Sequence, residues 1–325
     1  MQNDTKILFR FRLESVDYFG VYERGDTLEI LAMIIEGDVR MKVKVKVKVY
    51  IASAFSKDNA GGNRAGIIFL QEPLSVTQKI AIAKELGFSE SAFISNSEQA
   101  DFKFEYYTPT SEVDLCGHAT IASFTLMREL GKVVRNRYTI ETKAGIIPIE
   151  VQPKRIFMNQ QPSEFFEKIE KSELSEAIDI SAVNDNFDIQ VVSKGGKDIL
   201  VPVNINDLNA LNPNWQAIAT LSEQYGVIGM HVFGLSETDI VCRNFAPLYG
   251  INEESATGTS SGALACYLFT KNIRRQKAYI FQQGANLGSP SEIVVKLSVN
   301  QQDEIIGVNV GGAGYVDDVK FLEVI

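Results

Sequence analysis

Alternating polar and apolar residues are clearest at residues 42–51, where lysine and valine alternate up to a final Tyr-Ile pair. A two-residue period with β-branched side chains predicts a strand that has one face in the core and the other in water. The glycine-rich residues 311–314 predict a turn before a last short strand. Shorter stretches predict a hairpin at 138–151 and strands at 65–70, 91–95, 101–107, 199–203, 227–233, 239–245, 279–283, 291–299 and 304–310.

Two other runs are apolar on nearly every side of a helix: one follows Gly117, and the other is Gly262–Phe269. A helix of this kind is buried on all sides, whereas an amphipathic helix lies on a surface. An amphipathic helix is predicted at residues 75–87, because a serine and a glutamine at its start have the spacing of a capping box. A further helix is expected after Pro213.

A short motif occurs twice in the chain. Residues Glu112–His118 read Glu-Val-Asp-Leu-Cys-Gly-His, and residues Glu253–Thr259 read Glu-Glu-Ser-Ala-Thr-Gly-Thr. Each copy follows an aromatic-x-Pro turn and precedes one of the two all-round apolar runs. The repeat predicts an α+β fold of two pseudo-symmetric lobes, each a curved, mostly antiparallel sheet wrapped around a buried central helix. We expect a ligand to bind between the two helix starts.

The length of 325 residues is sufficient for two domains. We expect residues 41–151 to form the N-terminal lobe, joined by the C-terminal segment 311–325, and residues 152–310 to form the C-terminal lobe. Residues 1–40 lack a sustained period. For them we expect either an extension outside the main fold or an added strand and a short helix, and a start codon assigned too early is a further alternative.

Composition narrows the class of protein. The net charge of −9 argues against nucleic acid or an anionic membrane as the main partner. No apolar run reaches the roughly 18–20 residues that cross a bilayer, and three cysteines without a CxxC pair fit a reducing compartment, so a cytoplasmic location is expected. With only two histidines, a histidine-based metal site is not expected, and no cofactor is predicted.

The two helix starts are the first candidates for chemistry. A helix that begins at a glycine presents unpaired backbone N–H groups and the positive end of its dipole, which suits a carboxylate or phosphate. Gly117 and Gly258 are both at such starts, although both could merely allow a tight turn. The repeat favours binding, because the polar side chains of Cys116, His118 and Thr259 accompany these glycines.

Two titratable residues have a functional and a structural interpretation. His118 is a candidate acid/base or a donor to a substrate carboxylate, and the alternative is a helix-capping histidine. Glu90 stands between a helix end and an apolar strand, where its neighbours could raise its pKa and make it a proton shuttle. From local sequence alone, a solvated loop glutamate is the better interpretation of Glu90. His231 lies between apolar residues and is interpreted as structural.

Cys116 raises the alternative of a two-thiol epimerase, in which one cysteine removes a proton and another returns it. Such an enzyme needs a cysteine at both helix starts, and the second start has Thr257 and Thr259 instead. Threonine does not serve as a base without an activating group. The sequence therefore disfavours a two-cysteine mechanism.

Together these residues resemble the PhzF-like, or phenazine biosynthesis-like, family, which has the diaminopimelate-epimerase-type fold. The resemblance runs from about residue 41 to the C-terminus. The Cys-Gly-His-Ala-Thr sequence after a Thr-Pro turn is its most specific part. The matching stretches are Gly62-Asn63-x-Ala-Gly66, Glu85–Phe93, Tyr107-Thr-Pro109, Cys116–Thr120, Phe245-Ala-Pro247 and Ala256-Thr-Gly258.

The resemblance implies a cofactor-independent isomerase in which Glu90 moves a proton on the substrate. It implies that His118 binds or polarises the substrate, while Glu254 and Thr259 stand where the family has an aspartate and a serine. Asn63, in the matching glycine-rich loop, is a further supporting residue. The resemblance also implies a homodimer whose lobes clasp a small carboxylated metabolite.

The sequence departs from the family pattern at several of these positions. Glu254 is longer than the usual aspartate, Ser255 and Arg64 replace prolines, and Ser289 replaces a common arginine. These changes leave the proton chemistry in place and bear on the identity of the substrate. Two alternatives stand beside the isomerase: an amino-acid or hydroxy-acid epimerase that uses Cys116 as one base, and a catalytically silent module that binds a small molecule or a protein.

Overall fold

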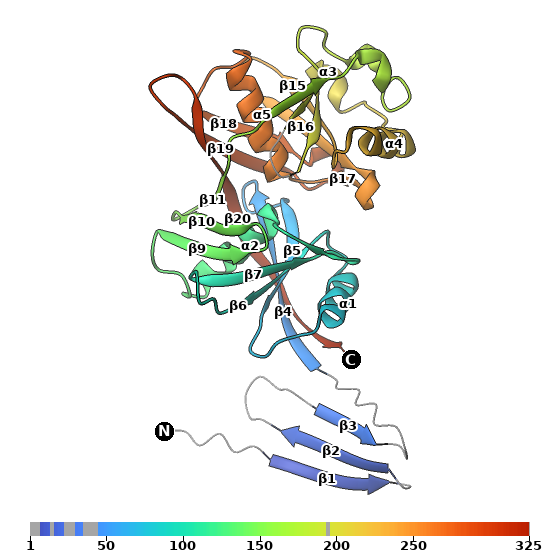
Figure 1. The fold of residues 1–325 in the computed structure, drawn as a ribbon, viewed down its shortest axis with the longest axis vertical. Coiled ribbons are helices and arrows are strands. Elements are labelled where there is room, and N and C mark those ends of the chain that lie inside the picture. The colour runs from blue at the N-terminus through green and yellow to red at the C-terminus, as the bar shows by residue number, and fades with distance from the viewer. Residues whose placement is uncertain (1–6, 14–15, 23–29, 35–44, 193–195, 325) are drawn as a thin grey trace.

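The protein has a mixed α+β fold in which most strands close into one barrel (Figure 1). The computed structural model describes residues 7–13, 16–22, 30–34, 45–192 and 196–324, with side chains for 46–192 and 196–323. The α+β class predicted from the repeat is confirmed.

The first half of the barrel surrounds helix α2. Its elements, in chain order, are β4 (Val45–Ser56), β5 (Asn63–Phe69), α1 (Val76–Leu86), β6 (Ser91–Ser95), β7 (Phe102–Tyr107), β8 (Glu112–Val113), α2 (Gly117–Glu129), β9 (Arg137–Thr142) and β10 (Gly145–Val151). The second half contains β11 (Ile156–Gln160), β12 (Phe165–Lys168), η1 (Lys171–Leu174), η2 (Ile180–Ala182), β13 (Gln190–Val192), β14 (Asp198–Val203), α3 (Ile205–Leu208), α4 (Trp215–Tyr225), β15 (Gly229–Leu235), β16 (Ile240–Ala246), η3 (Pro247–Tyr249), β17 (Ile251–Glu254), α5 (Gly258–Thr270), β18 (Ala278–Gln283), η4 (Ala285–Leu287), β19 (Ser291–Val299) and β20 (Ile305–Val324).

The directions of strand pairing repeat between the halves. In the first half, β5 and β6 are parallel, β6 and β7 antiparallel, β7 and β8 antiparallel, and β7 and β9 parallel. Strands β14 to β18 of the second half show the same succession of directions. A buried helix precedes the last strand of each series: α2 lies between β8 and β9, and α5 lies between β17 and β18. The repeated sequence motif therefore belongs to a larger repeat of supersecondary structure.

Strand β20 joins the two halves. Its first part pairs with β19 and β11, and its later part pairs with β4 over residues 313–324. The predicted turn at residues 311–314 is wrong, because the strand continues through these glycines. A Cβ atom at Gly311 would lie 2.2 Å from the Ile156 carbonyl oxygen, and one at Gly314 would lie 2.5 Å from the Ser53 carbonyl oxygen. The glycines permit close approach of other backbone segments instead.

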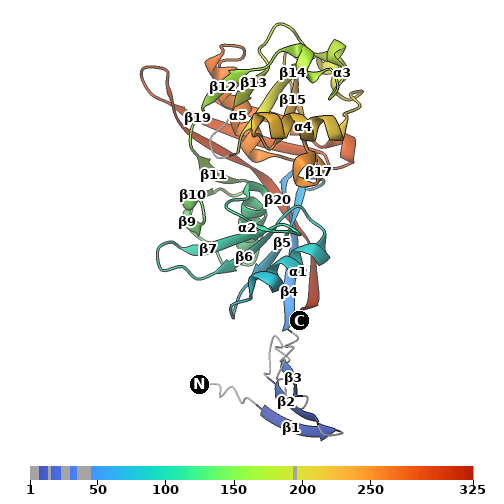
Figure 2. The ribbon, with the colours of Figure 1, turned by 45° about the vertical axis from the view of Figure 1, so that its right-hand side comes forward.

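The predicted helices are confirmed, although α5 begins four residues before the predicted run at Gly262. Ser75 and Gln78 form the expected capping box at the start of α1, and Gly87 closes the helix with a φ of 68°. Residues 118–127 of α2 are all buried, as are residues 260–269 of α5. Figure 2 shows α2 and α5 each enclosed by strands of its own half. A helix apolar on all sides has no face to leave in water, so the strands close around it.

The N-terminal residues form a sheet of their own, which consists of the antiparallel strands β1 (Ile7–Leu13), β2 (Val16–Tyr22) and β3 (Ile30–Ile34) (Figure 1). The alternative of an added strand and a short helix named no residues, and the described parts of this segment are all strands. A short apolar run does not distinguish a helix from a strand. Residues 42–44 of the predicted Lys-Val strand lie outside the described residues, and the rest belongs to β4.

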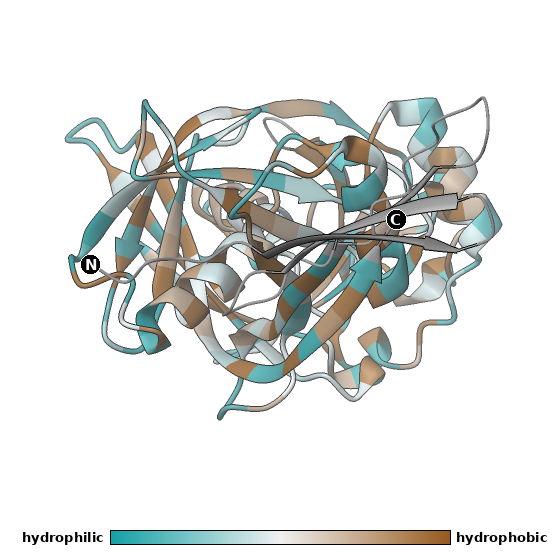
Figure 3. Cartoon of the chain, turned by 90° about the horizontal axis from the view of Figure 1, so that it is seen from below, coloured by the Kyte–Doolittle hydropathy of each residue, from teal (hydrophilic) through white to brown (hydrophobic). Residues whose placement is uncertain are grey.

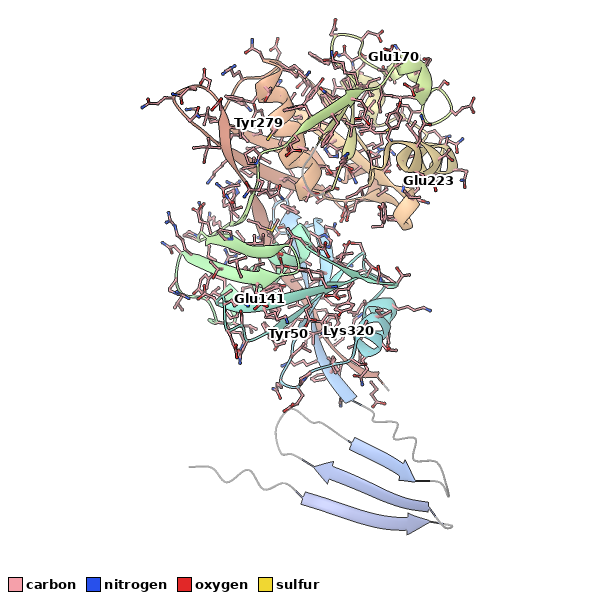
Figure 4. All side chains as sticks on the ribbon, in the orientation of Figure 1. Tyr50, Glu141, Glu170, Glu223, Tyr279 and Lys320 are labelled. Atoms are coloured by element: carbon pink, nitrogen blue, oxygen red, sulfur yellow. The ribbon has the colours of Figure 1, made fainter. Side chains whose placement is uncertain are left out.

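Apolar and polar residues alternate along the strands in Figure 3, as expected for strands with one face in the core. Figure 4 shows side chains filling the interior of both halves, while Glu170 and Glu223 lie at the periphery. Among the described residues, no helix is long and apolar enough to cross a membrane. In the first half, the core around α2 includes Phe124, whose ring lies 5.9 Å from that of Phe104 and 5.8 Å from that of Tyr138.

Truncation of this aromatic cluster tests the packing around α2. Phe124 is fully buried, so Phe124→Ala is expected to lower the free energy of unfolding by about 3–5 kcal/mol. Phe321 is 55% exposed and contacts Lys46 through its ring face, so Phe321→Ala is the control, with an expected loss of at most about 1 kcal/mol. Urea denaturation measures both values, and equal losses would contradict a core centred on α2.

Candidate active site

Glu90 occupies the last position before β6, three residues after the left-handed Gly87 that ends α1. Its side chain is 16% exposed, and its Oε2 atom lies 3.6 Å from Nε2 of His118. The two residues are 28 positions apart in the chain. Strand β6 and helix α2 bring them together, so Glu90 is not the solvated loop residue that its local sequence suggested.

Cys116 and His118 flank the glycine that begins α2. Cys116 is the N-cap residue, with extended backbone angles, and its side chain makes no capping hydrogen bond. Its Sγ atom instead lies 3.4 Å from Nδ1 of His118, and both side chains are buried. Glu90, Cys116 and His118 therefore form one compact cluster at the start of a buried helix.

Burial sets the protonation of the two helix-start residues. It lowers the pKa of His118, and the nearby charge of Glu90 opposes this shift only in part, so the imidazole is neutral at pH 7. Burial, followed by the charge of Glu90, raises the pKa of the Cys116 thiol well above its ordinary range. A neutral imidazole can donate or accept a hydrogen bond, whereas a protonated thiol is a poor base.

The second helix start is held by a different set of bonds. Thr257 is the N-cap residue of α5, and its backbone N–H donates to the side-chain oxygen of Gln283 over 3.2 Å. The Gln283 amide donates to the backbone carbonyl of Glu254 and to the Thr257 hydroxyl. This amide clamp fixes the turn between β17 and α5, and with it the direction of the Glu254 side chain.

Glu254 connects the two halves of the molecule. Its Oε1 atom accepts a 3.1 Å hydrogen bond from Nδ2 of Asn63, and its Oε2 atom lies 3.1 Å from the Thr257 hydroxyl. The Asn63 amide also donates to the carbonyl of Ala256. Burial, and then the charge of Glu90, raise the pKa of Glu254 to about 8. Glu254 is therefore largely a neutral carboxylic acid at pH 7, close to the Glu90 cluster.

The other predicted residues take supporting places. Gly258 is buried, and a Cβ atom there would lie 2.9 Å from the Phe55 ring, so this helix start has no room for a side chain. Gly117 is less crowded, because a Cβ atom there would lie 3.4 Å from the methyl carbon of Met158. Thr259 is exposed at the first turn of α5. His231 is buried within β15 and pairs with Asn244, which fits its structural interpretation.

A cavity of about 440 Å³ is lined by residues that adjoin the site residues in the sequence. Its lining includes Asn63 itself, Ser89, which precedes Glu90, and Ser255, which follows Glu254. These residues come from both halves of the chain. A small metabolite in this cavity would contact Asn63, and it would lie against residues that adjoin Glu90 and Glu254 in the sequence.

Two polar features of this region were missed from the sequence. Gln283 was predicted only as the last residue of a strand, yet it holds the start of α5. Asp198 is buried at the first position of β14, where Oδ2 accepts a 2.6 Å hydrogen bond from Ser260 of α5 and burial raises the pKa to about 6. The only local signal for Asp198 was a single carboxyl group at the edge of an apolar strand.

Comparisons with known proteins assign the family. The profile described as phenazine biosynthesis-like protein, PhzC-PhzF, matches residues 52–317. The chain belongs to the phenazine biosynthesis-like family. It is 33% identical over 277 residues to an uncharacterized isomerase of Clostridium acetobutylicum, a match that covers 79% of this chain and 92% of that protein. The family and the enzyme class expected from the motifs are thus confirmed.

Solved structures agree with this phenazine biosynthesis-like fold. The crystal structure of a Bacillus anthracis phenazine biosynthesis protein of the PhzF family has a TM-score of 0.78 and 28% identity, and covers 86% of this chain and 99% of that chain. A hydroxyproline epimerase from Agrobacterium vitis is 12% identical, with a TM-score of 0.58 and coverage of 86% of this chain and 91% of that one. At this identity the second comparison shows likeness of fold alone.

Three positions where this member of the phenazine biosynthesis-like family departs from the family pattern line the same cavity: Arg64, Ser255 and Ser289. The hydroxyls of both serines donate to the carbonyl of Gly62, over 3.0 and 2.9 Å. Arg64 forms an ion pair with Asp317 of β20 and remains 55% exposed. The departures therefore gather around one cavity, which Ser89, the sequence neighbour of Glu90, also lines.

The raised pKa of Glu254 predicts a pH-dependent stability. Between its unfolded value of about 4.5 and its folded value of about 8, the folded state binds more protons than the unfolded state. The contribution of Glu254 to stability is therefore complete below pH 4.5 and is lost as the pH rises through 8, with a slope of at most about 1.4 kcal/mol per pH unit. Glu254→Gln is expected to remove this loss, so the variant gains stability over the wild type as the pH rises.

Urea denaturation across this pH window measures the difference. Glu223→Gln, at an exposed position of α4, is the matched control and is expected to keep the wild-type pH dependence. A difference between Glu254→Gln and the wild type that is constant with pH would contradict the raised pKa.

Proposed function

We propose that the protein is a cofactor-independent isomerase that moves a proton on a small carboxylated metabolite, with Glu90 as the proton-moving residue. The observation that supports this most is the 3.6 Å approach of Glu90 to His118, beside a cavity with walls from both halves. The family resemblance assigns the proton transfer to the same glutamate. We also propose, from that resemblance, that the halves act as lobes of a homodimeric enzyme that clasp the substrate.

In the proposed reaction, Glu90 removes a proton from a carbon of the substrate and returns it at another carbon. Negative charge then develops on the substrate, and it needs nearby donors. Unpaired N–H groups at the starts of α2 and α5 supply donors and the positive ends of two helix dipoles. Donors fixed in place before reaction contribute on the order of 10²–10³ in rate each.

Neutral groups around Glu90 suit this task. His118 is uncharged and can donate a hydrogen bond without adding a competing proton source. Glu254 is largely protonated at pH 7 because burial and Glu90 raise its pKa. A neutral carboxylic acid does not repel a carboxylated substrate and can donate a hydrogen bond to it. Thr259 is exposed at the start of α5 and is proposed to orient the substrate.

The structure weakens both alternatives. An epimerase with Cys116 as a base needs its thiolate, which burial and the charge of Glu90 disfavour. A silent binding module would be favoured if Glu90 pointed away from His118, whereas the two side chains approach each other.

Replacement of Glu90 tests the proposed proton transfer. A thermal-shift screen of carboxylated metabolites, read by the stabilisation that a bound ligand gives, first supplies a substrate. Proton NMR in deuterated water then measures deuterium incorporation at carbon. Glu90→Gln is expected to lower the rate by about 10²–10⁴-fold, the usual contribution of a positioned acid or base. Glu98→Gln, in an exposed loop, should keep the wild-type rate; near-full activity of Glu90→Gln would refute the assignment.

Replacement of Cys116 separates the isomerase from the epimerase. If Glu90 moves the proton, Cys116→Ser should retain activity within about tenfold, because the hydroxyl preserves a small polar group at the N-cap. If Cys116 is a base, the variant should lose deuterium incorporation at a stereocentre while Glu90→Gln keeps it. The same NMR experiment on both variants decides between these outcomes.

A further inference from the structure

The cluster at the start of α2 carries three different metal-binding donors. They are a carboxylate oxygen of Glu90, Sγ of Cys116 and a ring nitrogen of His118, and all three atoms lie within 4.8 Å of one another. Their residues have fixed backbone positions, since two of them flank the first residue of a buried helix and the third precedes a central strand. The cluster is therefore more than a chance approach of mobile surface side chains.

The distances match the edges of a zinc coordination polyhedron. Zinc bonds of about 2.3 Å to sulfur and 2.0–2.2 Å to nitrogen or oxygen, arranged as a tetrahedron, place neighbouring ligand atoms about 3.3–3.6 Å apart. Here Nε2 of His118 lies 3.6 Å from Oε2 of Glu90 and 3.9 Å from Sγ of Cys116. The donor atoms of Glu90 and Cys116 lie within 4.8 Å of each other, and Sγ lies nearer to Nδ1 of His118, at 3.4 Å. A rotation of the imidazole ring and an approach of the side chains would bring the three donors onto one face of the tetrahedron. The fourth position would be left for water or a ligand.

The chemistry of the donors favours zinc over the abundant hard cations. Thiolate and imidazole suit Zn²⁺, whereas Mg²⁺ and Ca²⁺ prefer oxygen ligands throughout. The positive end of the α2 dipole disfavours a cation, and the charge of Glu90 opposes that effect. Glu254 also lies close enough for its charge to act on Cys116, which places a second carboxyl group near the proposed ion.

We propose that Glu90, Cys116 and His118 bind one Zn²⁺ and that the bound ion reversibly inhibits the enzyme. On binding, the Cys116 thiol releases its proton to solvent and a zinc–sulfur bond forms. The ion is an inhibitor and not a cofactor, because it occupies the carboxylate that is needed to accept the substrate proton. Inhibition rests on the proposed function of Glu90, whereas the binding site itself does not.

Cobalt(II) is the probe for the site, because a thiolate bound to Co²⁺ gives an intense charge-transfer absorption in the near ultraviolet. Full-length wild-type protein titrated with Co²⁺ is expected to develop this band at one equivalent and to lose it when Zn²⁺ is added. The titration needs no substrate, so it remains informative if the proposed reaction is wrong. Absence of the band in the wild type would overturn the proposal.

Variants assign the band to this cluster. Cys116→Ser is expected to abolish it, while Cys266→Ser, at a buried cysteine of α5, should keep it. Glu90→Gln should retain the band but bind Zn²⁺ at least about tenfold more weakly in chelator competition, since even the loss of an outer-shell partner costs about 10–100-fold. Circular dichroism checks that each variant is folded. A band that survives in Cys116→Ser, or an unchanged zinc affinity in Glu90→Gln, would place the metal elsewhere and reject the site.

Once a substrate is known, inhibition by Zn²⁺ can be measured separately from metal binding. Wild-type turnover should fall as Zn²⁺ is added and recover when a chelator removes the ion. Cys116→Ser should remain active at zinc concentrations that halve the wild-type rate. Metal binding without inhibition would retain the site and reject its regulatory role, and failure of the Glu90→Gln activity test alone would leave the cobalt result standing.

Discussion

Burial of two helices on all sides is the constraint on which the rest of the molecule depends. Neither α2 nor α5 has a face that can remain in water, so strands must surround each helix. The first turns of these helices still contain backbone N–H groups without helical partners. Enclosure by strands therefore concentrates unsatisfied donors at two points of the interior. The polar residues of the candidate site, from Asn63 to Gln283, gather around those points.

The same enclosure disfavours the charged forms of the titratable groups in the site. Glu90, Glu254 and Cys116 could together carry three negative charges at short range, and burial opposes the charges of Glu254 and Cys116. The pKa values of Glu254 and Cys116 are raised, so both groups near Glu90 keep their protons at neutral pH and the repulsion between charges is avoided. A pocket arranged in this way can accept an anionic substrate without a metal ion to offset repulsion, and it can also attract a divalent cation when the protons leave.

Local patterns predicted much of the fold, because they reflect local physics. The capping box at Ser75 and the buried run after Gly117 depend on residues within a few turns of each other. Contacts between distant segments followed no such pattern. The glycines at 311–314 have the freedom to turn, but only the approach of Ile156 and Ser53 shows why glycine is needed there.

In the candidate site, too, the features set by local sequence were predicted and those set by distant contacts were not. The repeated motif identified both helix starts, whereas Glu90 looked like an ordinary loop residue until the family resemblance was considered. Its contact with His118 spans 28 positions and has no signature in the intervening sequence. Gln283 and Asp198 are still harder to recognise, because their roles arise from hydrogen bonds to helix α5 and to the turn before it, which the order of residues does not reveal.

The pairing of β4 with β20 has a consequence for how the protein is made. One edge of residues 45–56 pairs with residues 63–67, whereas the other edge pairs with residues 313–324, far along the chain. A ribosome releases the N-terminal segment first, so one edge of β4 must wait until residues 313–324 have been made. Contacts of such long sequence separation also slow folding, because the chain must close a large loop before it gains the pairing energy. Before this pairing forms, the lysines of β4 protect the strand, because charged side chains on an unpaired edge discourage association with other chains.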